Sequence, residues 1–234
     1  VTSIGKGAFA GCERLTSIVV AEGNTMYDSR QNCHAIIQTG TDTLVCGCQS
    51  TTIPNGVKSI DKWAFMECKM LTSIIIPDSV TAIGNRAFEK CTSLTTITIP
   101  SSVTSIGHNA FYRCSSLTAI AIPNSVITVK DSAFYGCESL TSIIIGNRVT
   151  SIEDYAFDGC KKLTSITLPD SVTSIGECAF YNCESLTAIT IPESLEVLGE
   201  SAFENCSSLT AITYQGTIAQ WEEIILHEDW NSEV

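Results

Sequence analysis

The sequence has few basic residues and no long hydrophobic run. Lys and Arg account for 13 of its 234 residues, against 25 Asp and Glu, so the formal net charge is −12. Nucleic acids and anionic membrane surfaces are bound through clustered positive charge, so this balance argues against both as partners. The sequence also lacks a run of about eighteen apolar residues, which a membrane-spanning helix needs. We therefore expect no membrane insertion, and we attribute the acidic excess to solubility.

The sequence also lacks an initiating Met and a signal peptide, and it opens at Val1 in the middle of a repeat. This beginning suggests part of a longer protein. The missing signal therefore gives no information about the compartment in which the parent protein resides.

Aromatic residues make up only 7% of the sequence, but their placement is regular. All eight phenylalanines follow an Ala and precede a Cys by three residues, and from the second one onward they recur every 23 residues. They are Phe9, Phe65, Phe88, Phe111, Phe134, Phe157, Phe180 and Phe203. All six prolines also share one repeat position. A unit of this length cannot bury its own apolar positions, so we expect the units to stack into a solenoid.

The pattern within one unit predicts its local structure. Ile97 and Ile99 alternate with polar residues, which is typical of a strand with one buried face, and Pro100 ends that strand. A second extended segment is expected at 103–106, followed by a short helical turn around Phe111. The predicted fold class is therefore an α/β repeat solenoid, with a parallel sheet on one face and short helical turns on the other.

Two segments depart from the repeat within what we expect to be a single domain, 1–234. Residues 22–52 interrupt the spacing, and two apolar runs there, His34–Gln38 and Thr43–Cys46, flank a Thr-Gly-Thr-Asp sequence. This pattern predicts a β-hairpin that projects from the stack, either as packed edge or as a distinct recognition feature. Regular repeats are expected over 53–214.

Residues 215–234 are predicted to form a C-terminal cap. Trp221, Ile224 and Ile225 have the spacing of one helix face, and Trp230 follows them. Terminal repeats of a solenoid need an atypical segment that covers the last open turn.

The repeat pattern is specific enough to resemble a known family. The unit from Ile99 reads IPSSVTSIGHNAFYRCSSLTAIAIP, which is similar to the bacterial surface-antigen branch of the leucine-rich repeats, the Bacteroides surface protein A-like proteins. The resemblance implies a curved, right-handed leucine-rich-repeat array on a secreted or surface-anchored protein. It also implies adhesion to host matrix proteins and coaggregation between bacteria. The family has no catalytic motif whose residues carry over to this sequence.

The twelve cysteines invite a disulfide or metal interpretation. Eight occupy the position after Phe, where a reduced thiol packs as a small apolar side chain. Cys33 has Cys46 or Cys48 as a candidate disulfide partner across the predicted hairpin, and the state of Cys178 is open. Cys46 and Cys48 are the only close pair and no His lies at ligand spacing, so no metal and no cofactor is expected.

Catalysis is not expected either. The three histidines, His34, His108 and His227, occupy different repeat positions far apart in sequence, and no acid, base and nucleophile converge.

The outward face of the predicted sheet is the candidate binding site. Two positions in each strand point away from the core. They are Ser73, Ile75, Thr96, Thr98, Ala119, Ala121, Ser142, Ile144, Ser165, Thr167, Ala188 and Thr190. This set carries no charge and no aromatic side chain, so it suits an extended, flat partner or is an ordinary β surface. The second candidate is the rim around the Phe position, where Tyr112, Tyr135 and Tyr181 share one position beside variable charged residues.

These observations favour a non-enzymatic extracellular or cell-surface protein-binding module of the adhesin type. The expected partner is a protein or glycoprotein, including host extracellular matrix. A structural spacer that displays another domain, or an intracellular scaffold, is the alternative.

Overall fold

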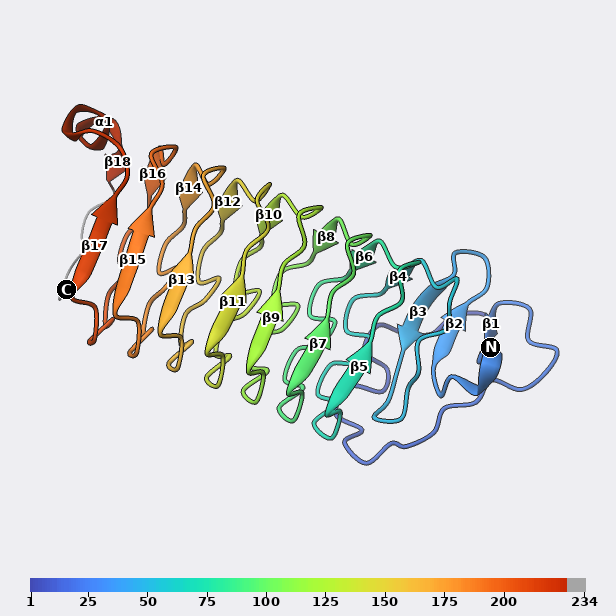
Figure 1. Cartoon of the computed structure of the whole chain (residues 1–234). Helices are drawn as coiled ribbons and strands as arrows, with labels where there is room; N and C mark the ends of the chain where they lie inside the picture. The colour runs from blue at the N-terminus through green and yellow to red at the C-terminus, as the bar shows by residue number, and fades with distance from the viewer. Residues whose placement is uncertain (227–234) are drawn as a thin grey trace.

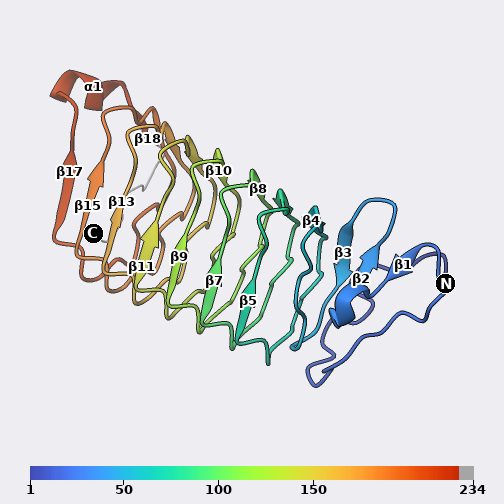
Figure 2. The ribbon, with the colours of Figure 1, turned by 45° about the vertical axis from the view of Figure 1, so that its right-hand side comes forward.

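The computed structural model describes residues 1–226, in which the chain winds through successive turns to form a solenoid (Figure 1). From residue 59 onward, the turns place their strands in two rows that run along the stack, as a second view also shows (Figure 2). Pairing within both rows is parallel. Among the described residues, no helix has the length and apolar character to cross a membrane.

The long-strand row contains strands of three or four residues. They are β5 (Ser73–Ile75), β7 (Thr96–Thr98), β9 (Ala119–Ala121), β11 (Ser142–Ile144), β13 (Ser165–Thr167), β15 (Ala188–Ile191) and β17 (Ala211–Tyr214). Equivalent repeat positions pair from turn to turn, for example Ile74 with Ile97. In β7, Ile97 is buried between exposed Thr96 and Thr98, as the alternating pattern predicts.

The short-strand row contains two residues per turn. Its strands are β4 (Ser59–Ile60), β6 (Ala82–Ile83), β8 (Ser105–Ile106), β10 (Thr128–Val129), β12 (Ser151–Ile152), β14 (Ser174–Ile175), β16 (Val197–Leu198) and β18 (Ile225–Leu226). These strands confirm the predicted second extended segment. Pairing is interrupted between β8 and β10 in this row, and between β11 and β13 in the long-strand row.

The helical turns expected around each Phe do not form. Arg86 and Lys90, on either side of Phe88, both have a left-handed φ of 57°. The N–H of Phe88 donates to the carbonyl of Ala110 in the next turn at 2.8 Å. A helix needs this N–H for a partner four residues earlier in its own turn. The prediction was wrong because hydrogen bonds along the stack replace the bonds of a helix.

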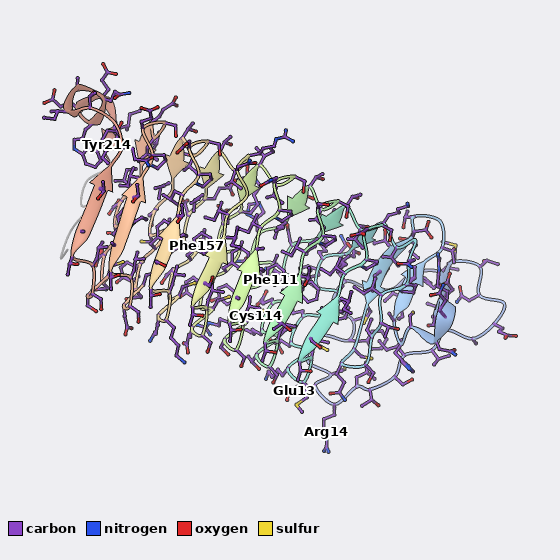
Figure 3. All side chains as sticks on the ribbon, in the orientation of Figure 1. Glu13, Arg14, Phe111, Cys114, Phe157 and Tyr214 are labelled. Carbon is purple, nitrogen blue, oxygen red and sulfur yellow. The ribbon has the colours of Figure 1, made fainter. Side chains whose placement is uncertain are left out.

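Seven phenylalanine rings form a continuous buried column. Neighbouring rings from Phe65 to Phe203 are stacked with centroids 5.0 to 5.5 Å apart. Phe111 and Phe157 mark this column in Figure 3. Phe9, assigned to the same position from sequence, is 40% exposed and lies outside the column.

The irregular segment explains the exclusion of Phe9. Its strands are β1 (Tyr27–Asp28), β2 (Ile36–Gln38) and β3 (Thr43–Cys46), with a 3₁₀ turn at Arg30–Asn32. The two runs predicted to form a hairpin are β2 and β3, which pair antiparallel. The hairpin does not project, however, because β3 also pairs in parallel with β4 and so extends the short-strand row.

Gly47, just after β3, covers the first ring of the column. A Cβ on this glycine would lie 2.1 Å from the Phe65 ring, and its N–H donates to the Ala64 carbonyl at 2.8 Å. The irregular segment therefore occupies the place at which the turn of Phe9 would otherwise stack.

At the other end, α1 (Ile218–Glu223) follows β17 and begins with a capping box between Thr217 and Gln220. Trp221 is half-buried against Tyr214, and Ile224 is buried. Ile225, predicted on the same helix face, is instead 60% exposed because the helix ends before it and β18 begins there. Trp230 and His227 lie outside the described residues.

Candidate functional site

The outward positions predicted from sequence lie together on one surface of the long-strand row. Of the twelve residues, Thr190 is half-buried and the others are exposed. The two large apolar side chains on this surface, Ile75 and Ile144, are 81% and 65% exposed. Turn-to-turn pairing aligns these side chains in two columns, as between Thr96 and Ala119. The result is an uncharged surface that we name the outward face.

Threonines just before the strands fix the register of this face. The hydroxyl of Thr95 donates to the Thr72 carbonyl at 3.1 Å, and Thr118 repeats the bond to Thr95 at 3.2 Å. The same position bonds in this way in later turns, through Thr141, Thr187 and Thr210. The outward face is therefore held on a regular backbone.

A second arrangement lies on the rim, at the position that follows each phenylalanine. This position holds Glu89, Tyr112, Tyr135, Asp158 and Tyr181 in consecutive turns. The Tyr112 and Tyr135 rings stack with centroids 4.7 Å apart. Asp158 separates Tyr181 from this pair, so the structure brings together two of the three tyrosines that the sequence placed here.

Both carboxylates beside the tyrosine pair are buried. Glu89 and Asp158 are each 6% exposed, although they belong to the rim. Burial raises the pKa of Asp158 to about 6, since a carboxylate removed from water favours its protonated form. In the sequence, Glu89 and Asp158 are among the variable charged residues of the rim, and their burial could not be predicted because it depends on the neighbouring turns.

Two surface hollows lie around the tyrosine pair. The first is lined by Arg86, Glu89, Lys90, Asn109, Tyr112 and Arg113. The second includes Arg113, Tyr135, Asp158, Lys161 and Asn182. The Arg113 guanidinium lies over the Tyr112 ring, 5.4 Å from its centroid, and lines both hollows.

The structure also brings together His108, Asp131 and Glu153, which sequence reasoning left apart. One ligand atom from each lies within 4.8 Å of the others, an arrangement that is able to hold a metal ion. His108 Nδ1 lies 3.0 Å from Asp131, and Lys130 donates to Glu153 at 2.7 Å. Burial and the neighbouring Glu153 raise the pKa of Asp131. The Lys130 ammonium already neutralises the Glu153 carboxylate, so part of the negative charge that a metal ion would need is balanced within the protein.

The cysteines of the repeat form a buried column beside the phenylalanines. The Cys114 thiol, labelled in Figure 3, donates to the Phe88 carbonyl at 3.1 Å. Burial raises the pKa of Cys137 to about 12, which disfavours the reactive thiolate. Cys12 departs from this pattern and is exposed, because its turn lies outside the column. All twelve cysteines lie in the described region as free thiols, including the candidate pair partners Cys33, Cys46 and Cys48.

Comparison with family models assigns the chain to a repeat family. The BspA type leucine rich repeat region matches in six copies, over residues 1–36, 44–163 and 127–228. These matches cover most of the sequence, so the chain belongs to this family and is a leucine-rich-repeat solenoid. Comparison with curated protein sequences gives no match.

Solved structures of bacterial repeat proteins are similar to this chain. A leucine-rich repeat protein from Eubacterium ventriosum is 31% identical, with a TM-score of 0.82, and the alignment covers 90% of this chain and 57% of that one. A leucine rich cell surface protein from Faecalibacterium prausnitzii is 30% identical, with a TM-score of 0.59 and coverage of 94% and 65%. A leucine-rich repeat protein from Bacteroides ovatus is 29% identical, with a TM-score of 0.62 and coverage of 78% and 54%. The chain spans less than two thirds of each relative.

Proposed function

We propose that this chain is a non-enzymatic binding module of the adhesin type, that it acts outside the cell or at the cell surface, and that its partner is a protein or glycoprotein. Membership of the BspA-type family and similarity to a bacterial cell surface protein support this proposal. The supporting observation from the structure is the uncharged outward face with exposed Ile75 and Ile144.

The dimensions of the outward face favour a macromolecular partner. The six strands that carry the outward face are spaced about 5 Å apart and give a surface on the order of 25 Å long. The face carries no pocket-forming aromatic side chain, so a small molecule would leave most of its own surface in water. An extended protein surface can instead bury the exposed isoleucines and the rows of Ser, Thr and Ala together.

The test is binding of the purified chain to a panel of matrix and plasma glycoproteins by surface plasmon resonance. A Thr98→Arg/Thr167→Arg variant places two long charged side chains on the outward face. The matched control is Thr104→Arg/Thr150→Arg, which adds the same charges at exposed threonines preceding the short-strand row. Circular dichroism should show that both variants fold.

Saturable binding that the first variant loses and the control keeps is the expected result. Binding that survives in both variants would contradict the assignment to the outward face. If the chain binds no panel member, the adhesin proposal fails and the spacer or intracellular scaffold becomes the better interpretation.

A further inference from the structure

The rim position after phenylalanine contains an arrangement that solubility alone does not explain. In four consecutive turns it holds Glu89, Tyr112, Tyr135 and Asp158. The two rings stack, and the acid on each side of them is 6% exposed. Variable residues on a solvated rim are ordinarily exposed, since burial of a carboxylate costs free energy unless it is hydrogen-bonded or paired.

The buried Glu89 carboxylate has an oxygen without a hydrogen-bond partner. Among the described residues, Oε2 of Glu89 is the only buried side-chain oxygen or nitrogen that lacks a hydrogen-bond partner. The closest cation is the Arg86 guanidinium at 3.6 Å, which is too long for a hydrogen bond. Glu89 belongs to the lining of the first hollow. A ligand that donates a hydroxyl hydrogen there would satisfy it.

Positive charge gathers in the same hollow, although the chain as a whole is acidic. Three of the 13 basic residues line it, namely Arg86, Lys90 and Arg113. The Lys90 ammonium binds Glu67 at 2.9 Å, whereas Arg113 lies over the Tyr112 ring. The guanidinium groups of Arg86 and Arg113 are suited to carboxylate or sulfate, which they bind through paired hydrogen bonds.

The tyrosine pair lies where the two hollows meet, with Tyr112 in the lining of the first and Tyr135 in the lining of the second. Tyr112 and Tyr135 are half-buried, and their rings differ in orientation by 11°. Arg113 lines the hollow on each side of the pair, so a ligand that extends from one hollow to the other crosses the rings. The second hollow repeats the chemistry of the first, with Asp158 and Lys161 in place of Glu89 and Lys90.

We propose that these hollows bind an acidic saccharide, one that carries carboxylate or sulfate groups. Its anionic group pairs with Arg86 and Arg113, a ring hydroxyl donates to Glu89, and the apolar part of a sugar ring contacts the exposed part of Tyr112. A free inorganic anion meets the cations but is repelled by the buried carboxylate. A neutral sugar satisfies the carboxylate but adds no ion pair to the guanidinium groups. This site is separate from the outward face and stands independently of the adhesin proposal.

The test is isothermal titration calorimetry of the whole chain with four probes. They are 3′-sialyllactose, which carries a carboxylate, a heparin-derived tetrasaccharide, which carries sulfates, and lactose and inorganic sulfate as controls. At least one acidic saccharide is expected to bind about tenfold more tightly than lactose or sulfate, which corresponds to about 1.4 kcal/mol. The two acidic probes distinguish a carboxylate from a sulfate ligand.

Variants identify the contacts. Arg86→Gln and Tyr112→Ala should each weaken binding of the acidic saccharide about fivefold or more. The control is Tyr181→Ala, at the same repeat position as Tyr112 but in neither hollow, which should change the affinity by no more than about twofold. Tyr112→Phe keeps the ring and should bind like the parent chain. Glu89→Gln should weaken binding of the saccharide, whose hydroxyl then loses a charged acceptor. The same variant should strengthen binding of sulfate, because it removes the negative charge that repels this anion.

The proposal is overturned if neither acidic saccharide binds more tightly than its controls. It is also overturned if Glu89→Gln strengthens binding of the acidic saccharide, since the Glu89 carboxylate would then only repel the anionic group. An equal loss in Tyr181→Ala would contradict the location. The Thr98→Arg/Thr167→Arg variant should bind the saccharide like the parent chain. Failure of the saccharide proposal is therefore distinguishable from failure of the proposal that the outward face binds a protein.

Discussion

At the residue scale, each phenylalanine inside the column, from Phe88 to Phe180, is supported by the same ring in the turns on both sides. Phe134 is fully buried, with the Phe111 and Phe157 centroids at 5.4 and 5.5 Å. Its N–H donates to the Ala156 carbonyl at 2.9 Å, so the backbone spacing around the ring is also fixed. A cavity at this point has little opportunity to collapse, and loss of the ring removes contacts with both neighbours.

We predict that Phe134→Ala lowers the free energy of unfolding by about 3–5 kcal/mol, the range for a buried aromatic residue. Urea unfolding followed by circular dichroism measures it. Phe9→Ala is the matched control, since Phe9 is 40% exposed and outside the column, and its cost should be clearly smaller. Equal losses at the two positions would mean that the column does not stabilise the stack.

Asp158 gives a pH-dependent prediction. Its pKa in the folded chain is about 6, above the ordinary value of 3.8. Between these values the folded chain keeps a proton that the unfolded chain releases, so stability falls as pH rises from about 4 to 6. Asp158→Asn removes this loss and should stabilise the chain at pH 7 by about 1–3 kcal/mol.

Urea unfolding of the parent chain and of Asp158→Asn, at pH 7 and at pH 4.5, measures this difference. The gain should shrink at the lower pH. Asp170→Asn, at an exposed acid, provides the control and should change stability little at either pH. A gain for Asp158→Asn that is the same at both pH values would show that ionisation of this carboxylate is not its cause.

At the element scale, strands were easier to predict from the sequence than the segments between them. Alternation at Ile97 and Ile99 is local, and it correctly placed the buried and exposed residues of β7. Every second N–H around Phe88 donates to the next turn, so nothing within one repeat distinguished this conformation from a helical turn. The outward face followed from strand alternation alone. The hollows around Tyr112 did not, because burial of Glu89 depends on adjacent turns.

Close approach between turns depends on the glycine after the short strands. A Cβ on Gly107 would lie 2.5 Å from the backbone nitrogen of Asn85 in the preceding turn. The equivalent residue in the next turn is Lys130, and the short-strand row is interrupted there, between β8 and β10. The following turn has Glu153 at this position and still pairs with β10, through β12. The interruption therefore coincides with Lys130, but the intact pairing at Glu153 shows that a side chain at this position does not by itself separate the turns.

We predict that Gly107→Ala destabilises the chain by about 1–3 kcal/mol, because two turns must separate to admit one methyl group. Thermal or urea unfolding measures the effect. Gly40→Ala is the control, since a Cβ there meets no atom within 4 Å. A tolerated Gly107→Ala would indicate that the turns are packed less closely than the structure shows.

At the scale of the whole molecule, the two ends of the phenylalanine column are covered by different segments. Gly47 covers Phe65 at one end, and the side chains of residues 1–22 are mostly exposed. The repeat spacing counted Phe9 in the column because spacing does not reveal which segment stacks on Phe65. Stability in such an array comes from contacts between adjacent turns, so the turn outside the column has the weakest support.

This difference predicts a gradient of amide hydrogen exchange along the chain. Amides of Phe111, Phe134 and Phe157 donate to the next turn within the buried column, so they should exchange slowest. Amides of residues 5–12 bond within their own turn at an exposed position and should exchange by local opening. Mass spectrometry of peptic fragments at several exchange times measures the gradient. Fragments from residues 5–12 should lose protection at least about tenfold sooner, which corresponds to an opening free energy about 1.4 kcal/mol lower. Uniform exchange across all turns would instead mean that the first turn unfolds only together with the column, and that its contacts with the irregular segment are stronger than its exposure indicates.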